Sequence, residues 1–298
     1  MKIAKHLIRI PLSALCLTVI TLTACGSDGE SNTLGTARPL VVAANVNGAT
    51  RASIADAWEG RELVALKIGS DTYQYRVTSS TDATLQSVVD GNLFYWQPVP
   101  SSYTVTAWSY GNSTDYSATP PTTFALNVNQ NSGNKELLYV NNQAIYYSAS
   151  RVPEVYFYHQ LAKVVVNITY KTSTTISTIT FGTDASKLPL AGSFNAPSEV
   201  GVNYGEWTFG ENTGTIIPKT ETANEKYSAI LIPGDYSGKE LFSITIADGT
   251  QFVYTVPGSL TLAPGNVYVY NIVVDDVKIT FSGVQVTDWT TSRRNVDM

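Results

Sequence analysis

Residues 162–170 read Ala-Lys-Val-Val-Val-Asn-Ile-Thr-Tyr. In an extended chain, alternate residues of this stretch share one apolar face: Ala162, Val164, Val166, Ile168 and Tyr170. Lys163, Asn167 and Thr169 fall on the opposite face. A period of two with one apolar face is typical of a half-buried antiparallel strand. The stretch therefore predicts a β-strand, and the rest of the chain is interpreted around it.

The same kind of pattern recurs on both sides of this strand. From Ala37 onward, short alternating runs are separated by Gly, Pro, Asn and Asp, and no 12-residue segment has a clean helical apolar stripe. Before the strand, one face of a first strand is expected to hold four apolar residues: Leu40, Val42, Ala44 and Val46. Further strands are expected at 63–68, at 103–107 and, apolar on both faces and therefore central, at 267–274. The chain is predicted to be all-β.

One hairpin can be placed in register from the pattern alone. Pairing Phe242 with Val256 and Ile246 with Phe252 keeps the large apolar side chains on one face. The same pairing predicts an odd-numbered loop centred on Gly249.

The polar run Thr172–Thr175 predicts a boundary between two successive antiparallel β-sandwich domains, at residues 37–171 and 172–298. The last predicted strand lies within 277–289. There Ile279 and Phe281 are expected to share one face and Val284 and Val286 the other, with a bend at Gly283.

Residues 1–24 are interpreted as a signal peptide. A cationic start precedes a short apolar stretch that ends at Leu22-Thr23-Ala24-Cys25, the small-residue pattern of a bacterial lipobox. Cleavage before Cys25 and acylation of its thiol would attach the chain to a membrane. Residues 25–36, polar and rich in Gly and Ser, are expected to form a tether.

Composition excludes several classes of function. The formal net charge is −5 and only 14% of residues are charged, so no basic field is present to hold nucleic acid. Two His and two Cys leave little material for a metal site or for nucleophilic catalysis. His159 is therefore interpreted as a structural residue. The sequence predicts a protein without cofactor, metal or enzymatic activity.

Several motifs, in this order, resemble the fimbrillin family, the type V pilins and related Gram-negative lipoproteins. They are the lipobox at Cys25, Thr50-Arg51-Ala52 with Trp58-Glu59, the stretch 156–164, Ile230-Leu231-Ile232-Pro233, the stretch 262–270 and Val286-Thr287-Asp288-Trp289. The resemblance implies two transthyretin-like β-sandwich domains and a surface-exposed lipoprotein of the outer membrane that assembles into fimbriae. The resemblance does not distinguish between shaft, tip and anchor subunits of such fimbriae.

The resemblance also implies maturation by a trypsin-like protease after an Arg that follows the first strand. Arg51 is the residue that matches; Arg38, followed by Pro39, and Arg61, at a strand edge, are less suitable. Loss of the first strand would open an apolar groove, and a strand of a neighbouring subunit would fill it. The segment 277–289, with Ile279, Phe281, Val284 and Val286, is the expected donor because it is alternating and near the C-terminus.

A function from another class stays open beside the fimbrial subunit. Five Trp and eighteen Tyr suggest a surface lipoprotein that binds host or bacterial glycans, because aromatic faces stack on sugar rings. Trp96 and Trp108 are the best candidates for such a platform. Exposed coplanar aromatic rings would favour the glycan binder, and a removable first strand over apolar pockets would favour the fimbrial subunit.

Overall fold

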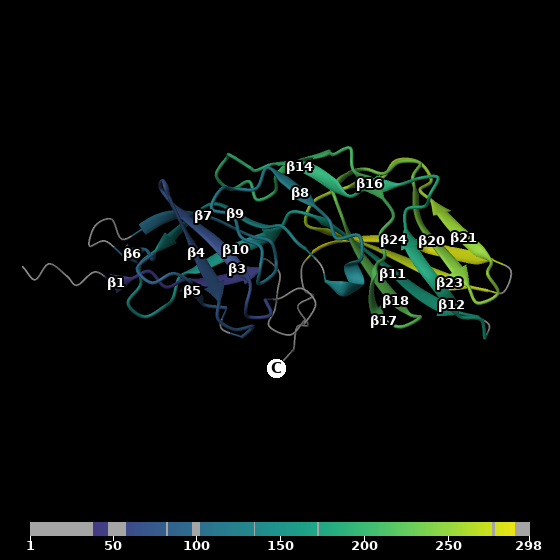
Figure 1. Ribbon diagram of the computed structural model, residues 1–298, viewed down its shortest axis with the longest axis horizontal. Coiled ribbons are helices and arrows are strands. Elements are labelled where there is room, and N and C mark those ends of the chain that lie inside the picture. Colours follow the sequence, from purple (N-terminus) through teal and green to yellow (C-terminus); the bar gives the residue numbers. More distant parts are fainter. Residues whose placement is uncertain are drawn as a thin grey trace, which may run out of the picture. The chain divides into compact units, whose positions relative to one another are not determined.

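The structure, a computed structural model, describes residues 38–46, 58–81, 83–96, 102–133, 135–171, 173–275 and 278–289 (Figure 1). Within these ranges the regular elements are β-strands and one short 3₁₀ helix, η1 (Gln130–Ser132). The expected all-β class is thereby confirmed. The predicted signal peptide, Cys25, the tether and Arg51 lie outside the described residues.

The N-terminal strands form a seven-stranded sheet. Its order is β2 (Ala43–Val46), β10 (Glu154–His159), β9 (Leu138–Tyr146), β7 (Ser102–Ser109), β3 (Leu63–Ile68), β4 (Asp71–Val77) and β5 (Leu85–Ser87). A small ladder joins β1 (Arg38–Pro39) to β6 (Tyr95–Trp96). The predicted strand at 63–68 matches β3. Val64 and Leu66 lie in one buried cluster with the apolar side chains of the first segment, whereas Ala65 lies in the other cluster.

The C-terminal strands form a β-sandwich of two facing sheets. The larger has the order β17 (Lys219–Thr222), β18 (Lys226–Leu231), β11 (Ala162–Tyr170), β23 (Asn266–Val274) and β24 (Ile279–Asp288). The smaller has the order β12 (Ile176–Phe181), β20 (Glu240–Ile246) and β21 (Gln251–Thr255). Phe242 of β20 meets Tyr270 of β23 edge to face, with ring centroids 5.5 Å apart. Alternation along each strand therefore supplies one apolar layer to a shared core.

Three smaller ladders complete the chain. They are β15 (Glu206–Phe209) with β14 (Ala191–Asn195) and β8 (Thr123–Ala125), β13 (Leu188–Pro189) with β16 (Thr213–Gly214), and β19 (Gly234–Asp235) with β22 (Thr261–Leu262). Gln130 of η1 inserts its buried amide against β18, where Nε2 donates to the Ile230 carbonyl and Oε1 accepts from the Ile230 amide. Segments from both halves of the chain thus share hydrogen bonds.

The strand with the clearest alternation, β11, pairs with other strands than expected. β11 lies between β18 and β23, so it belongs to the C-terminal sheet, and the change of sheet falls between β10 and β11. The expected boundary at 171/172 is wrong as a boundary between sheets. The expectation of purely antiparallel sheets is also wrong, because β11 runs parallel to β23 and β2 runs parallel to β10. Alternation shows that a strand is half-buried but carries no information about its partner.

The hairpin of β20 and β21 has an odd-numbered loop as expected, but its register differs by two residues. Phe242 pairs with Tyr254 and Ile244 with Phe252. The Ile246 amide donates to the Thr250 carbonyl and closes a three-residue loop, in which Gly249 is the last residue with φ +92°. A left-handed residue at that place is usual for three-residue loops, and the two-residue shift preserves every face.

Candidate functional site

The first segment of the described chain is held like a core strand. Its four alternating apolar side chains are each 5% exposed or less: Leu40, Val42, Ala44 and Val46. They lie in a cluster with Trp58, Tyr75 and Phe157. Burial of each of the larger side chains contributes about 1.5–3 kcal/mol to the free energy of folding. The expected inward face of the first strand is therefore confirmed.

Hydrogen bonds tie this segment on both edges. On one side β2 runs parallel to β10, with Ala44 opposite Val155. On the other side the Ala44 amide donates to the Ala83 carbonyl at 2.8 Å, and the Leu85 amide donates to the Val42 carbonyl at 2.9 Å. The first segment thus fills a slot between β10 and the start of β5. Its removal would expose two backbone edges and a row of apolar pockets.

Trp58 adds a contact that the sequence did not indicate. Its indole Nε1 donates a buried 2.8 Å hydrogen bond to the Ala44 carbonyl, and its ring meets Phe157 edge to face at 5.3 Å. Trp58 follows the segment that cleavage after Arg51 would release, so the indole would stay in the slot and keep a donor for an incoming strand.

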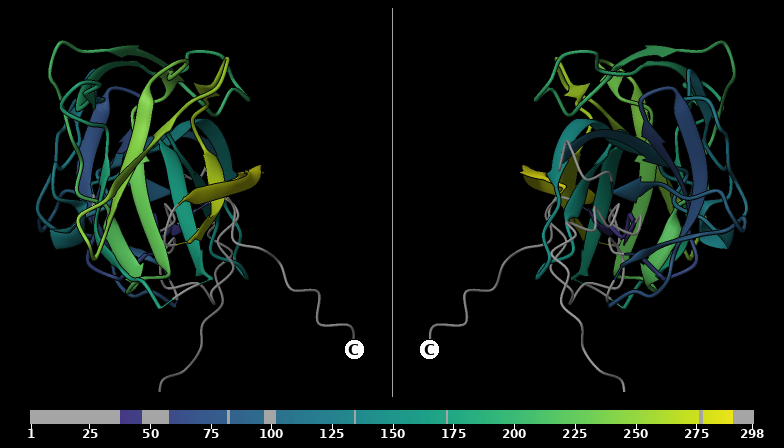
Figure 2. Two further views of the ribbon diagram at one scale, coloured as in Figure 1. Left: turned by 90° about the vertical axis from the view of Figure 1, so that its right-hand side faces the viewer. Right: turned by 90° about the vertical axis from the view of Figure 1, so that its left-hand side faces the viewer.

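The second candidate surface is β24 at the opposite end of the chain. In the part of the chain that the structure describes, it is the terminal strand of its sheet, with β23 on one side (Figure 2). Phe281, Val284 and Val286 are 37%, 41% and 53% exposed. An edge strand with partly exposed apolar side chains presents both unpaired backbone groups and apolar surface to a partner.

The register of β24 corrects one expectation. Tyr270 pairs with Val284, but Ile272 pairs with Phe281, so β24 has one extra residue between these pairs. This β-bulge falls at Ser282 and Gly283 and brings both apolar pairs to the same face. The expectation that Val284 and Val286 lie on the opposite face from Phe281 is wrong. The sequence did contain a signal for this bulge: Phe281 and Val284 are three residues apart, and Gly283 lies between them.

Beyond β24, the indole of Trp289 is buried and lies flat against His159, the last residue of β10. Lys163 Nζ lies 5.4 Å from the indole ring centre. His159 Nδ1 makes no hydrogen bond, although Glu136 Oε2 lies 3.1 Å away. Packing against an indole is consistent with the structural interpretation of His159.

Two indoles expected as a sugar platform are buried. Trp96 and Trp108 are 7% and 1% exposed, and Trp108 Nε1 donates to the Ser117 carbonyl at 3.0 Å. Trp96 stacks on Tyr103 with ring centroids 5.3 Å apart. Buried faces cannot stack on a sugar, so these two residues are excluded as a platform. Core packing decides their role instead.

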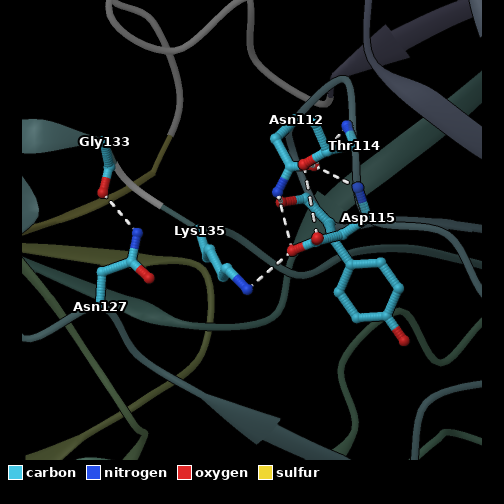
Figure 3. Close-up of polar contacts among 7 residues, drawn as sticks. Asn112, Thr114, Asp115, Asn127, Gly133 and Lys135 are labelled. Atoms are coloured by element: carbon cyan, nitrogen blue, oxygen red, sulfur yellow. Dashed lines mark hydrogen bonds and ion pairs between the residues drawn. The ribbon is translucent and has the colours of Figure 1, made fainter.

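Figure 3 shows a polar cluster that includes Asp115 and Lys135. These two residues also line a hollow of about 380 Å³. Lys135 Nζ lies 2.7 Å from Asp115 Oδ2, and Asn112 Oδ1 accepts from the Asp115 amide at 2.7 Å. The hydrogen bond from Lys135 lowers the pKa of Asp115, more than desolvation raises it. Tyr110 and Tyr116 also line the hollow, so charged, amide and aromatic groups converge there. No motif in the sequence indicates this cluster.

The other two arginines considered for cleavage, Arg38 and Arg61, lie within the described residues. Arg38 is exposed in β1, and Arg61 is exposed just before β3. Among the described residues, no group of three or more His, Cys, Asp or Glu is placed to hold a metal ion. No helix in the described ranges is long and apolar enough to cross a membrane.

The described residues form β-sheets, with a buried first segment and, near the end of the described range, an edge strand. The profile of the fimbrillin-like family matches residues 50–289, and the chain belongs to this family. No curated protein matches the sequence.

Two solved structures share the fold at low identity. A proposed cell adhesion protein of Bacteroides uniformis has a TM-score of 0.60 and 18% identity over 85% of this chain and 99% of that one. Another, of Bacteroides ovatus, has a TM-score of 0.60 and 16% identity over 87% and 100%. A tip fimbrial protein of Porphyromonas gingivalis, solved with a C-terminal truncation, has a TM-score of 0.48 and 11% identity over 84% and 100%.

Proposed function

We propose that this chain is a structural or adhesive fimbrial subunit that polymerises by strand exchange between copies. The proposal rests on one relationship. The first segment fills a slot with four buried apolar side chains, while β24 carries exposed apolar side chains on an edge strand. Release of the first segment would leave a slot that needs a strand, and β24 is a strand with an open edge.

The geometry favours an open chain of subunits over a closed pair. The slot and β24 are different surfaces, so each copy would donate to one neighbour and accept from another. Such head-to-tail contacts generate filaments when the rotation does not close. In this arrangement the incoming β24 would complete the sheet of the acceptor that the first segment had left.

Two further steps, export and maturation, are proposed from sequence motifs alone. We propose that Cys25 carries a lipid anchor for outer-membrane delivery, and that a trypsin-like protease cleaves after Arg51 to release the first segment. No step in this cycle requires a catalytic group, metal or cofactor of the chain itself.

Deletion of residues 277–298 tests the donor assignment. The truncated chain should be less stable, because it loses the buried Trp289, but it should remain folded by circular dichroism, because Phe281, Val284 and Val286 are exposed. It should not polymerise after protease treatment. Deletion of residues 290–298 alone is the matched control and should polymerise like the wild type. Wild-type polymer yield from the longer truncation would refute the assignment. If that truncation does not fold, Val284→Asp in the full chain replaces it.

The hollow bordered by Asp115 and Lys135 favours glycan binding as a second candidate function. A paired carboxylate and ammonium can hydrogen-bond sugar hydroxyls, and Tyr116 offers an aromatic ring beside them. Glycan-array binding that Tyr116→Ala and Asp115→Asn both abolish, with unchanged thermal unfolding, would support it. Array signals that neither substitution changes would exclude this hollow as the binding site.

A further inference from the structure

The β-bulge in β24 has a consequence for how this strand fits a second copy of the chain. Cα pairing with β23 places positions 279, 281, 284 and 286 opposite Val274, Ile272, Tyr270 and Tyr268. These four partners alternate along β23 and have buried side chains. Directly opposed residues in an antiparallel ladder share a face, so the four apolar positions of β24 form one row.

The row exists because of Gly283. This residue has φ +120°, a backbone conformation that residues with a Cβ rarely adopt. Space is not the constraint, because a Cβ at this position would meet nothing within 4 Å. A regular strand through Ser282 and Gly283 would instead put positions 281 and 284 on opposite faces. Gly283 therefore converts two separate apolar pairs into one row of four.

The slot of the first segment has the matching pattern. Its occupants Leu40, Val42, Ala44 and Val46 are four buried side chains at two-residue steps. The backbone register of the bulged β24 places four positions with apolar residues at the same ladder spacing. An unbulged β24 would present two on each face, so two pockets would stay empty and two apolar side chains would face outward.

We infer that the Gly283 bulge is the register-setting device of the donor strand: it gives β24 the four-residue row that fills the slot of a second copy. This inference rests on the proposed strand exchange. Ser282 and Gly283 then serve to match the strand to the slot of the partner copy. They do not merely allow a bend between two independent halves of the strand.

The test uses the chain with Cys25→Ser, triggered by trypsin, and measures polymer yield by sedimentation and electron microscopy. Gly283→Val should lower the yield at least about tenfold, equivalent to about 1.4 kcal/mol or more. Gly283→Val combined with deletion of Ser282 should restore it to within about twofold, because the deletion restores the two-residue spacing without a positive φ. Gly258→Val, at an exposed glycine with φ +83° and nothing within 4 Å, is the matched control and should polymerise normally.

Each outcome decides the inference. Normal polymerisation of Gly283→Val would overturn it, and so would failure of the Ser282 deletion to rescue, because the row and not the glycine itself is the proposed determinant. Thermal unfolding of each monomer before trypsin treatment separates lost assembly from lost folding. If wild-type protein does not polymerise, strand exchange itself fails, a result distinguishable from failure of the bulge.

Discussion

The imidazole of His159 stacks on the indole of Trp289, with ring centroids 4.0 Å apart and 3° between the ring planes. His159 ends β10, the strand that pairs with the first segment, and Trp289 follows β24, the proposed donor. Trp289 is 3% exposed, whereas Phe281, Val284 and Val286 are at least a third exposed. The end of the proposed donor strand is therefore fixed at the strand that forms one wall of the slot.

Trp289→Ala should loosen β24 in the monomer. Loss of a buried indole of this size costs about 3 kcal/mol of unfolding free energy, and hydrogen exchange along β24 should accelerate. Trp289→Phe keeps an aromatic ring on His159 and should retain most of the protection. Unchanged exchange in β24 of Trp289→Ala would show that the backbone ladder with β23 holds the strand by itself.

Val286→Asp should separate assembly from monomer stability. Val286 is about half exposed in the monomer, so the unfolding free energy should change by no more than about 0.5–1 kcal/mol. In an apolar slot the same carboxylate would be buried without a partner, at a cost of several kcal/mol. Polymer yield should collapse while the melting temperature hardly moves. Thr287→Asp, on the other face of the strand, is the control; equal loss of polymer in both variants would contradict a one-faced insertion.

Arg51→Ala should block maturation. Mass spectrometry after trypsin-like digestion should show release of the segment that ends at Arg51 in the wild type only, and fibres should fail to form from the variant. Arg61→Ala should behave like the wild type. Fibres that form equally well from Arg51→Ala protein would remove Arg51 as the trigger and direct attention to Arg38 or Arg61.

Cys25→Ser should prevent acylation, because serine has no thiol to accept the diacylglycerol. Metabolic labelling with a fatty acid should mark the wild type and not the variant, and fractionation should no longer recover the variant in the outer membrane. Normal outer-membrane delivery of Cys25→Ser protein would be incompatible with the lipobox interpretation.

Two buried tyrosines set an alkaline limit on stability. Burial raises the pKa of Tyr236 and of Tyr270 well above the ordinary value of 10.0. A raised folded pKa contributes stability that is complete below the unfolded pKa and is lost as pH rises above about 10. The urea midpoint should therefore fall steadily above pH 10. Tyr236→Phe should reduce that slope and cost about 1 kcal/mol at neutral pH, because its hydroxyl donates to the Ile232 carbonyl. An identical slope in the variant would contradict the assignment.

Alternation along the chain was sufficient to predict the inner faces of the first segment and of β11, although not that of β24. Leu40 to Val46 and Ala162 to Ile168 bury the predicted residues, because the side-chain period of two is a local property of extended backbone. The central place of β23 also followed from its sequence, since a strand that is apolar on both faces needs neighbours on both sides. Family membership could be recognised from the order of short motifs.

The tertiary structure alone decided which strands pair and in what register. β11 could have joined either half of the chain, and its parallel partner β23 lies about a hundred residues further along the sequence. The β20–β21 pair could shift by two residues without moving a side chain to the other face. The bulge at Gly283 became visible only in the ladder with β23, where the register gives β24 one extra residue between Phe281 and Val284. Periodicity is set by neighbouring residues, whereas partner and register are set by long-range packing that a single strand does not encode.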